Sequence, residues 1–188
     1  MNTNTKTLPS RIILCALLIL AAVLGCTNKS APLIVVYMPD RIIQDFSDMR
    51  EHEIVSWAWI RRGFTLSNCG SFELEPVMDS SKNPNPAVVS RIEEVLKTIL
   101  KDSMNANGDL ELIVRANVLD VKVKPGRIKS WFADFDTMPY VELEILIADR
   151  ATGLPMAKII HFRRNEKSLT TAVSDILGDL KLFFTTAI

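Results

Sequence analysis

The stretch "YVELEILIADRATGLPMAKIIHFRR", residues 140–164, carries the pattern from which the fold of this chain is predicted. Apolar and polar side chains alternate in its first ten residues, which is typical of a strand that buries one face. Glu142 and Glu144 are expected to point to solvent. The turn-like "DRATG" ends in a Gly that suits a positive φ, so "PMAKIIHFRR" is predicted to return as a hairpin partner. The residues expected to face the core are Val141, Leu143, Ile145 and Ile147.

Further elements are predicted on both sides of this hairpin. "SFELEP", residues 71–76, alternates like a strand, and Asn85 before Pro86 is typical of a helix start. The apolar side chains that follow recur at helical spacing until "NANG", residues 105–108, ends the helix. In "DLELIVRANVLDVKVKP" the apolar phase changes at Leu119 and continues at Val123, which predicts a bulge within a strand. An amphipathic helix is expected from Leu169 to Phe184.

The predicted order is strand, helix, strand, strand, strand, helix. A strand–helix–strand unit favours a parallel pair with a right-handed crossover, and the hairpins add antiparallel neighbours. The fold class is therefore predicted to be α/β: a two-layer sandwich with a mixed, mostly antiparallel sheet and helices on one face. Residues 33–38 have strand character that Pro39 interrupts. Residues 40–62 are ambiguous and are compatible with a partly helical segment.

The start of the chain has the composition of an export signal. "IILCALLILAAVLGC", residues 12–26, is uncharged and follows Lys6 and Arg11, with no acidic residue before it. A helix that crosses a bilayer needs about 20 apolar residues, so this run is short for a span. A basic region, a short apolar region and a small residue at the end are typical of a secretory signal. An ordinary cleaved signal and an uncleaved short anchor are the alternatives.

The residues "VLGC", Val23 to Cys26, resemble the lipobox of bacterial lipoproteins. This resemblance implies that the leader is cut between Gly25 and Cys26, and that Cys26 carries diacylglycerol and further acyl chains such as palmitate. Two or more chains give a stable membrane anchor without a spanning helix. Because Thr27 rather than Asp follows, the resemblance also implies the periplasmic face of the outer membrane. The expected division is a signal peptide over 1–25, a lipidated Cys and linker over 26–32, and one globular periplasmic domain over 33–188.

Charge and cysteine content narrow what the chain is expected to do. Of the 22 basic residues two belong to the leader, so 20 remain against 22 acidic ones, and such a chain has no electrostatic reason to bind nucleic acid. Cys69 is the one cysteine left beyond Cys26. It cannot form an internal disulfide and is expected to be a small residue at a turn or strand start; a reactive thiol or an intermolecular link is the alternative.

A second resemblance covers residues 118–153. A strand, a Pro-Gly-Arg bend, an aromatic loop, an alternating strand and an Asp-x-x-Thr-Gly turn follow one another there, and this order looks like a family of small bacterial lipoproteins of unknown function. The matching residues are Pro125, Gly126, Arg127, Asp149, Thr152 and Gly153.

No motif in the sequence predicts catalysis or a cofactor. His52 is expected to be solvated and His161 to be a structural residue within a strand. No metalloprotease His spacing, Gly-x-Ser-x-Gly elbow, Cys-x-x-Cys pair or Gly-rich phosphate loop occurs. Asp134 and Asp136 offer too few oxygens for calcium, which takes six to eight. The chain is therefore predicted to be no enzyme and to hold neither metal nor cofactor.

The long connection over residues 124–139 is the first candidate for binding, because most hairpin loops hold two to five residues. Loops on a rigid scaffold commonly carry binding, and aromatic residues and Arg are enriched in interfaces. The alternative is that these aromatics pack locally against the edge of the sheet. The predicted partner contacts are Arg127, Trp131, Phe132 and Phe135.

A second candidate is "VSWAWIRRG", where Trp57 and Trp59 alternate beside Arg61 and Arg62 and predict an aromatic strand face, either packed or binding. These observations together predict a lipid-anchored, non-enzymatic accessory or adaptor protein of the envelope, with an envelope protein as its partner. The alternative is a lipid or small-molecule carrier with a pocket between sheet and helices.

Overall fold

The computed structural model describes residues 40–123 and 138–188 of the chain. Seven strands of this part form one sheet in the order β1-β2-β7-β6-β5-β3, and β4 also pairs with β5. The elements are β1 (Arg50–Glu51), β2 (Trp57–Ile60), the 3-10 helix η1 (Leu66–Asn68), β3 (Cys69–Leu74), β4 (Met78–Asp79), α2 (Pro86–Ser103), β5 (Leu110–Lys122), β6 (Tyr140–Asp149), β7 (Pro155–Arg164) and α3 (Leu169–Thr186).

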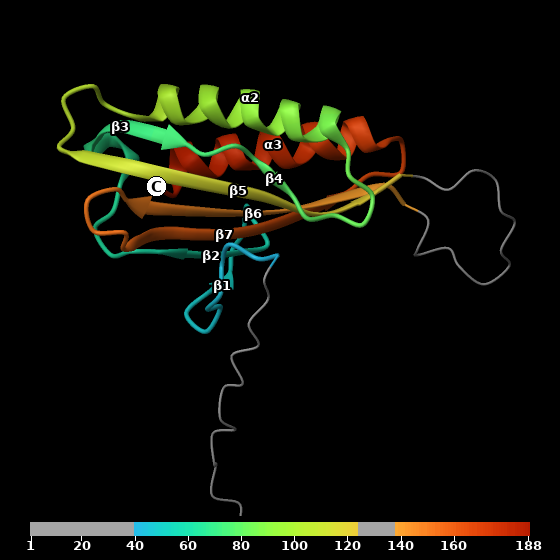
Figure 1. The fold of residues 1–188 in the computed structure, drawn as a ribbon, viewed down its shortest axis with the longest axis horizontal. Helices are drawn as coiled ribbons and strands as arrows, with labels where there is room; N and C mark the ends of the chain where they lie inside the picture. Colours follow the sequence, from blue (N-terminus) through green and yellow to red (C-terminus); the bar gives the residue numbers. More distant parts are fainter. Residues whose placement is uncertain (1–39, 124–137) are drawn as a thin grey trace, which may run out of the picture. The chain divides into compact units, whose positions relative to one another are not determined.

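The helices α2 and α3 cover one face of the sheet, as Figure 1 shows. The unit β3–α2–β5 gives a parallel strand pair, with Phe72 opposite Leu112. The pairs β5–β6 and β6–β7 are antiparallel. The predicted fold class, a two-layer α/β sandwich with a mixed, mostly antiparallel sheet and helices on one face, is confirmed.

The β6–β7 hairpin has the predicted turn. Gly153 adopts a φ of 70°, and its N–H donates to the Asp149 carbonyl at 2.8 Å. The hydroxyl of Thr152 donates to the Asp149 carboxylate at 2.6 Å, which fixes the first residue of the Asp-x-x-Thr-Gly turn. A left-handed φ is open to Gly at little steric cost. The turn thereby sets the register between β6 and β7.

The bulge in β5 is confirmed as well. The register with β6 shifts between Val118 and Asp120, so Leu119 is the extra residue. Val121 resumes the buried face after the bulge. Val123, which was expected to continue the apolar face, is exposed, because the strand ends at Lys122.

The two helices begin as their capping residues dictate. The Asn85 side chain accepts from the Val88 N–H, and Pro86 occupies the first turn of α2, as predicted. The Ser168 side chain accepts from Thr171 at the start of α3. Apolar stripes of both helices pack on the sheet and form the core between the layers. Its fully buried members include Ile92, Leu96, Leu100, Leu112, Val114, Leu143, Ile145, Ile176, Leu180 and Phe183.

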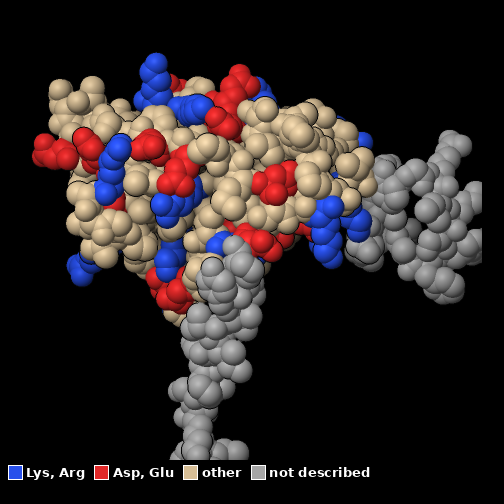
Figure 2. Space-filling model, viewed as in Figure 1, with Lys and Arg blue, Asp and Glu red and all other residues tan. Residues whose placement is uncertain are grey.

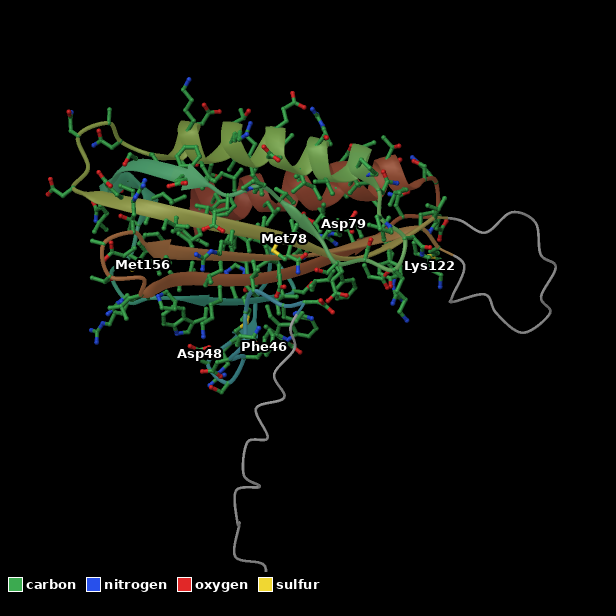
Figure 3. All side chains as sticks on the ribbon, in the orientation of Figure 1. Phe46, Asp48, Met78, Asp79, Lys122 and Met156 are labelled. Atoms are coloured by element: carbon green, nitrogen blue, oxygen red, sulfur yellow. The ribbon has the colours of Figure 1, made fainter. Side chains whose placement is uncertain are left out.

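Residues 40–49, here called the strap, lie on the other face of the sheet, which we call the outer face. Phe46 and Asp48 are seen there in Figure 3, on the side of the sheet away from the helices. The strap is not helical; it leads into β1, which pairs with β2. The ambiguous region 40–62 is therefore a strap and two short strands. Its buried side chains form a second, smaller cluster, made of Ile43, Met49 and Ile160 with Ile42, Phe46, Trp59 and Leu146 around them.

The strap explains why one prediction was wrong. Glu144 was expected in solvent, yet its side chain is 0% exposed. Its carboxylate accepts from the Arg41 Nε at 3.0 Å, from the backbone N–H groups of Ile42 and Ile43 at 2.9 and 3.4 Å, and from the Asn117 amide at 3.0 Å. The same amide donates to the Asp40 carbonyl at 2.6 Å. A buried carboxylate needs such donors to offset its desolvation.

Several predictions fall outside the described residues. They concern the leader with Gly25 and Cys26, the strand character of residues 33–38, and the loop with its candidate contacts Arg127, Trp131, Phe132 and Phe135. Over the part of the chain that is described, neither helix combines the length and the apolar character that a bilayer-crossing segment requires.

Candidate functional site

An aromatic patch lies on the outer face beside the strap. We define it by Trp57 on β2, Tyr140 on β6, and Phe162 and Arg164 on β7. The rings of Trp57 and Phe162 lie side by side, with centroids 6.4 Å apart and planes inclined by 37°. The two side chains remain 40% and 39% exposed. The guanidinium carbon of Arg164 lies 5.9 Å from the ring centroids of both Tyr140 and Phe162.

Strand register brings these four residues together. Trp57 lies opposite Ile160, and Tyr140 lies opposite Arg164. Alternate residues of a strand share one face, so Ile160, Phe162 and Arg164 all point to the outer face. The helix-facing residues between them contribute to the core or contact α3 instead. The patch is therefore a rigid surface built on three neighbouring strands.

Two acidic neighbours influence the patch. The Tyr140 hydroxyl donates to the Asp120 carboxylate. Burial, together with this acceptor, raises the pKa of Tyr140 to about 12, so the phenol keeps its proton at neutral pH. Glu142, opposite Phe162, has its pKa raised by burial and by the charges of Asp120 and Glu144, with Arg41 acting in the other direction.

The helix-facing side of β7 carries a second polar arrangement. His161 is buried; its Nδ1 accepts the Ser56 backbone N–H at 3.1 Å and lies 3.1 Å from the Ser56 hydroxyl. Its Nε2 lies 2.9 Å from the carboxylate of Asp179 on α3, which Arg163 also contacts. The structural role predicted for His161 fits this geometry. A hydroxyl, an imidazole and a carboxylate nevertheless meet here, although the sequence indicated no nucleophile–base pair.

This arrangement is better suited to holding strands than to activating Ser56. The Nδ1 lone pair already receives a backbone N–H, so it is not free to take the hydroxyl proton. The Ser56 Oγ accepts the Phe162 N–H at 3.3 Å and so extends the link between β2 and β7. Burial lowers the pKa of His161, with Asp179 opposing, which favours the neutral ring.

Two smaller predictions are settled by packing. His52 was expected in solvent, but it is half-buried, and its ring lies edge-on to Phe183 with centroids 4.9 Å apart. Cys69 is fully buried at the first residue of β3, as the structural interpretation predicted. Burial raises the pKa of its thiol to about 11, which keeps it in the unreactive thiol form.

A cavity of about 300 Å³ lies between the N-terminal ends of the helices. The carrier alternative predicted a pocket between the sheet and the helices, and this cavity lies elsewhere. In the space between the sheet and the helices the buried side chains of the core pack together. Its lining consists of Asn85, Ala87, Val88, Arg91, Leu169, Thr170, Val173 and Ser174.

Charge and metal-ligand geometry add little to this picture. Basic and acidic side chains are interspersed over the face shown in Figure 2. Among residues 40–123 and 138–188, no three His, Cys, Asp or Glu side chains are grouped so that they could hold a metal ion.

Sequence reasoning found one member of the patch and missed three. Trp57 was noticed through its alternation with Trp59, and the two residues have different fates: Trp57 is exposed, while Trp59 packs in the small cluster under the strap. Tyr140, Phe162 and Arg164 were predicted only as residues of strands. Phe162 and Arg164 could have been found from the alternation of "HFRR" at the end of β7, which places an aromatic and a cationic residue on the same face. Tyr140 could not, because its place in the patch depends on the pairing of β6 with β7.

Comparison with known proteins gives no family. The sequence matches no family model, and no curated protein matches it. Among solved structures it resembles the PelC dodecamer from Paraburkholderia phytofirmans, with 14% identity, a TM-score of 0.47, and 66% of this chain aligned to 94% of that one.

Two further likenesses are to lipoproteins. Lipoprotein GNA1162 from Neisseria meningitidis shares 11% identity over 59% of this chain and 92% of that one, with a TM-score of 0.39. A minor lipoprotein from Acinetobacter baumannii shares 14% identity over 64% and 94%, with a TM-score of 0.32. At such values these likenesses carry no conclusion about function.

Proposed function

We propose that this chain is a lipid-anchored, non-enzymatic accessory protein of the bacterial cell envelope that binds a protein partner through the aromatic patch. The observation that carries the proposal is the pair of exposed rings, Trp57 and Phe162, in contact on a rigid sheet beside Arg164. The lipobox-like Gly25–Cys26 supports the anchor, and with Thr27 it supports the periplasmic face of the outer membrane.

The patch has the composition of an interaction surface. Trp, Tyr and Arg are the residue types that contribute most to binding at interfaces, and they act best when clustered. Burial of apolar surface contributes about 25 cal/mol of favourable free energy per Å². Two adjacent exposed rings lack this contribution in the free protein, and a partner that covers them would supply it. Leu182 on α3 is also half-exposed, but a single exposed apolar residue is ordinary.

The anchor places a limit on where the partner can be. Cys26 precedes Asp40, the first described residue, by 14 residues, and 14 residues span at most about 50 Å. The folded part would therefore begin within this distance of the membrane, and its partner would be a protein of the membrane or of the adjacent envelope. The predicted contacts Arg127, Trp131, Phe132 and Phe135 belong to the segment that joins β5 to β6, and β6 contributes Tyr140 to the patch. They remain predicted contacts of the same partner.

The proposal is tested by photo-crosslinking in cells. A photoreactive amino acid at position 57 should give a discrete crosslinked band in the native anchored form, and the same residue at position 182 should not. In Cys26→Ser the band should weaken at least tenfold, because the anchor no longer concentrates the protein at the membrane. Equal patterns from positions 57 and 182, or no band from either, would contradict the proposed surface.

A further inference from the structure

The strap is attached to the sheet separately from the main core. Its apolar residues Ile43 and Met49 pack with Ile160 in the small cluster, whereas the helices pack in the large one. Segments with few apolar contacts and their own small cluster open at lower free energy than the core. The strap therefore meets the physical condition for local opening.

Polar contacts hold the strap at both ends. At its start, Arg41, Ile42 and Ile43 all donate to the single carboxylate of Glu144. Near its end, the Lys158 ammonium on β7 donates to both oxygens of Asp48 at 3.0 Å and to the Asp45 carbonyl at 3.0 Å. Each of these groups can exchange its partner for water. Opening therefore leaves no charged group unpaired in an apolar environment. In the docked state the burial of Glu144 carries a desolvation cost, which the contacts of the strap must offset.

The direction of the chain decides how the strap would leave. Its C-terminal end is fixed, because Arg50 and Glu51 pair with Ala58 and Trp57 in the sheet. Its N-terminal end continues toward Cys26. Tension from that side would act first on Asp40, whose carbonyl accepts the Asn117 amide, and then on Arg41 and its contact with Glu144.

We infer that residues 40–49 form a detachable strap, which peels from the sheet starting at Asp40 and serves as the extendable end of the tether. This inference rests on the proposed function in one respect, namely that the tether leads to a lipid anchor at Cys26. Release of ten residues adds at most about 35 Å to the reach of the folded part from the membrane. It also uncovers Leu146, Trp59 and Ile160 beside the aromatic patch.

The test is hydrogen exchange of the full chain in detergent micelles, followed by mass spectrometry with fragmentation. The reporter amides are those of Ile42 and Ile43, which donate to Glu144. In the wild-type chain they should exchange at least tenfold faster than the amides of β6. In Glu144→Gln they should exchange at least tenfold faster again, while the β6 amides keep their rate.

Glu111→Gln is the control. It removes an exposed carboxylate from β5, six residues before Asn117, and it leaves the contacts of Arg41 and the hydrogen bonds between the strap and Glu144 in place; the reporter amides should keep the wild-type rate. If Glu144→Gln does not fold, Arg41→Gln loosens the strap from its own side and should give the same acceleration. Reporter amides that exchange only as fast as β6 in the wild-type chain would overturn the inference. That result would leave the crosslink from position 57 to decide the proposed function independently.

Discussion

His161 shows how much one side chain can contribute when it lies between three elements. It connects β7 to Ser56 before β2 and to Asp179 on α3. Because Nδ1 must accept the Ser56 N–H, only the ring with its proton on Nε2 satisfies both contacts. Protonation of Nδ1 would place two donors face to face, so the charged ring does not fit the folded state.

This geometry predicts a pH dependence of stability. Burial lowers the pKa of His161 in the folded state, so the unfolded chain takes up the proton first. The free energy of unfolding should therefore be constant above about pH 7 and fall as pH decreases through the unfolded value of about 6.5, by at most about 1.4 kcal/mol per unit. Urea unfolding of wild type and His161→Gln between pH 7.5 and 5 checks this prediction. A slope equal in both proteins would contradict it.

The ionisation of Asp179 does not contribute to the pH dependence measured between pH 7.5 and 5. Burial acts to raise the pKa of its carboxyl, but hydrogen bonds from Arg163 and His161 outweigh burial and lower it. A carboxylate with a lowered pKa contributes stability above its unfolded value and loses it only as pH falls below about 4. The two groups therefore act in separate pH ranges.

At the scale of elements, the periodicity of the sequence predicted those helices and strands that are defined by local residues and bury one face. The β6–β7 hairpin follows from alternation and from "DRATG", and α2 follows from Asn85, Pro86 and an apolar stripe. Glu144 obeys the same alternation, yet it is buried, because alternation tells which face a residue is on and not what covers that face. The strap has no period, so the second covering layer could not be predicted from it.

Contacts between residues far apart in the chain also could not be predicted from the sequence. The patch needs β2 beside β7, and nothing in "VSWAWIRRG" indicates which strand it joins. Trp57 could therefore be recognised as a candidate, but its neighbour Phe162 could not. The same holds for Ser56 and His161, whose meeting depends on the same strand pair.

Gly108 lies so close to the backbone at the start of β3 that a side chain at this position would clash. A Cβ added at Gly108 would lie 2.5 Å from the backbone carbon of Cys69 and 2.6 Å from that of Asn68. Gly108→Ala should therefore lower the free energy of unfolding by more than about 2 kcal/mol. The control is Gly178→Ala in α3, where an added Cβ meets nothing within 4 Å. It should stabilise the protein by about 0.5–1 kcal/mol, since Ala is the better helix former. Chemical denaturation of both variants measures the difference, and equal effects would contradict the close approach.

At the scale of the whole molecule, the proposed membrane anchor depends on acylation of one residue, Cys26. Metabolic labelling with an alkyne-bearing palmitate should mark the wild-type chain and leave Cys26→Ser unmarked, because that sulfur is the predicted attachment site. The variant should also move from the membrane fraction to the soluble fraction, since it lacks the acyl chains that give stable binding. Cys69→Ser is the control and should be labelled like wild type. Labelling that persists in Cys26→Ser would show that the lipobox resemblance is misleading.

The place of β2 in the sheet also determines when the protein can finish folding. Trp57 to Ile60 pair with Ile160 to Ala157, about 100 residues later, and pairs so distant in sequence form slowly. A nascent chain has already presented β2 long before β7 leaves the ribosome. Until then one edge of the sheet lacks its neighbour, and the His161 contacts that lock α3 to β2 are also missing. A chain built in this way stays incompletely folded until β7 has been synthesised, which would suit the export that its lipobox-like leader predicts.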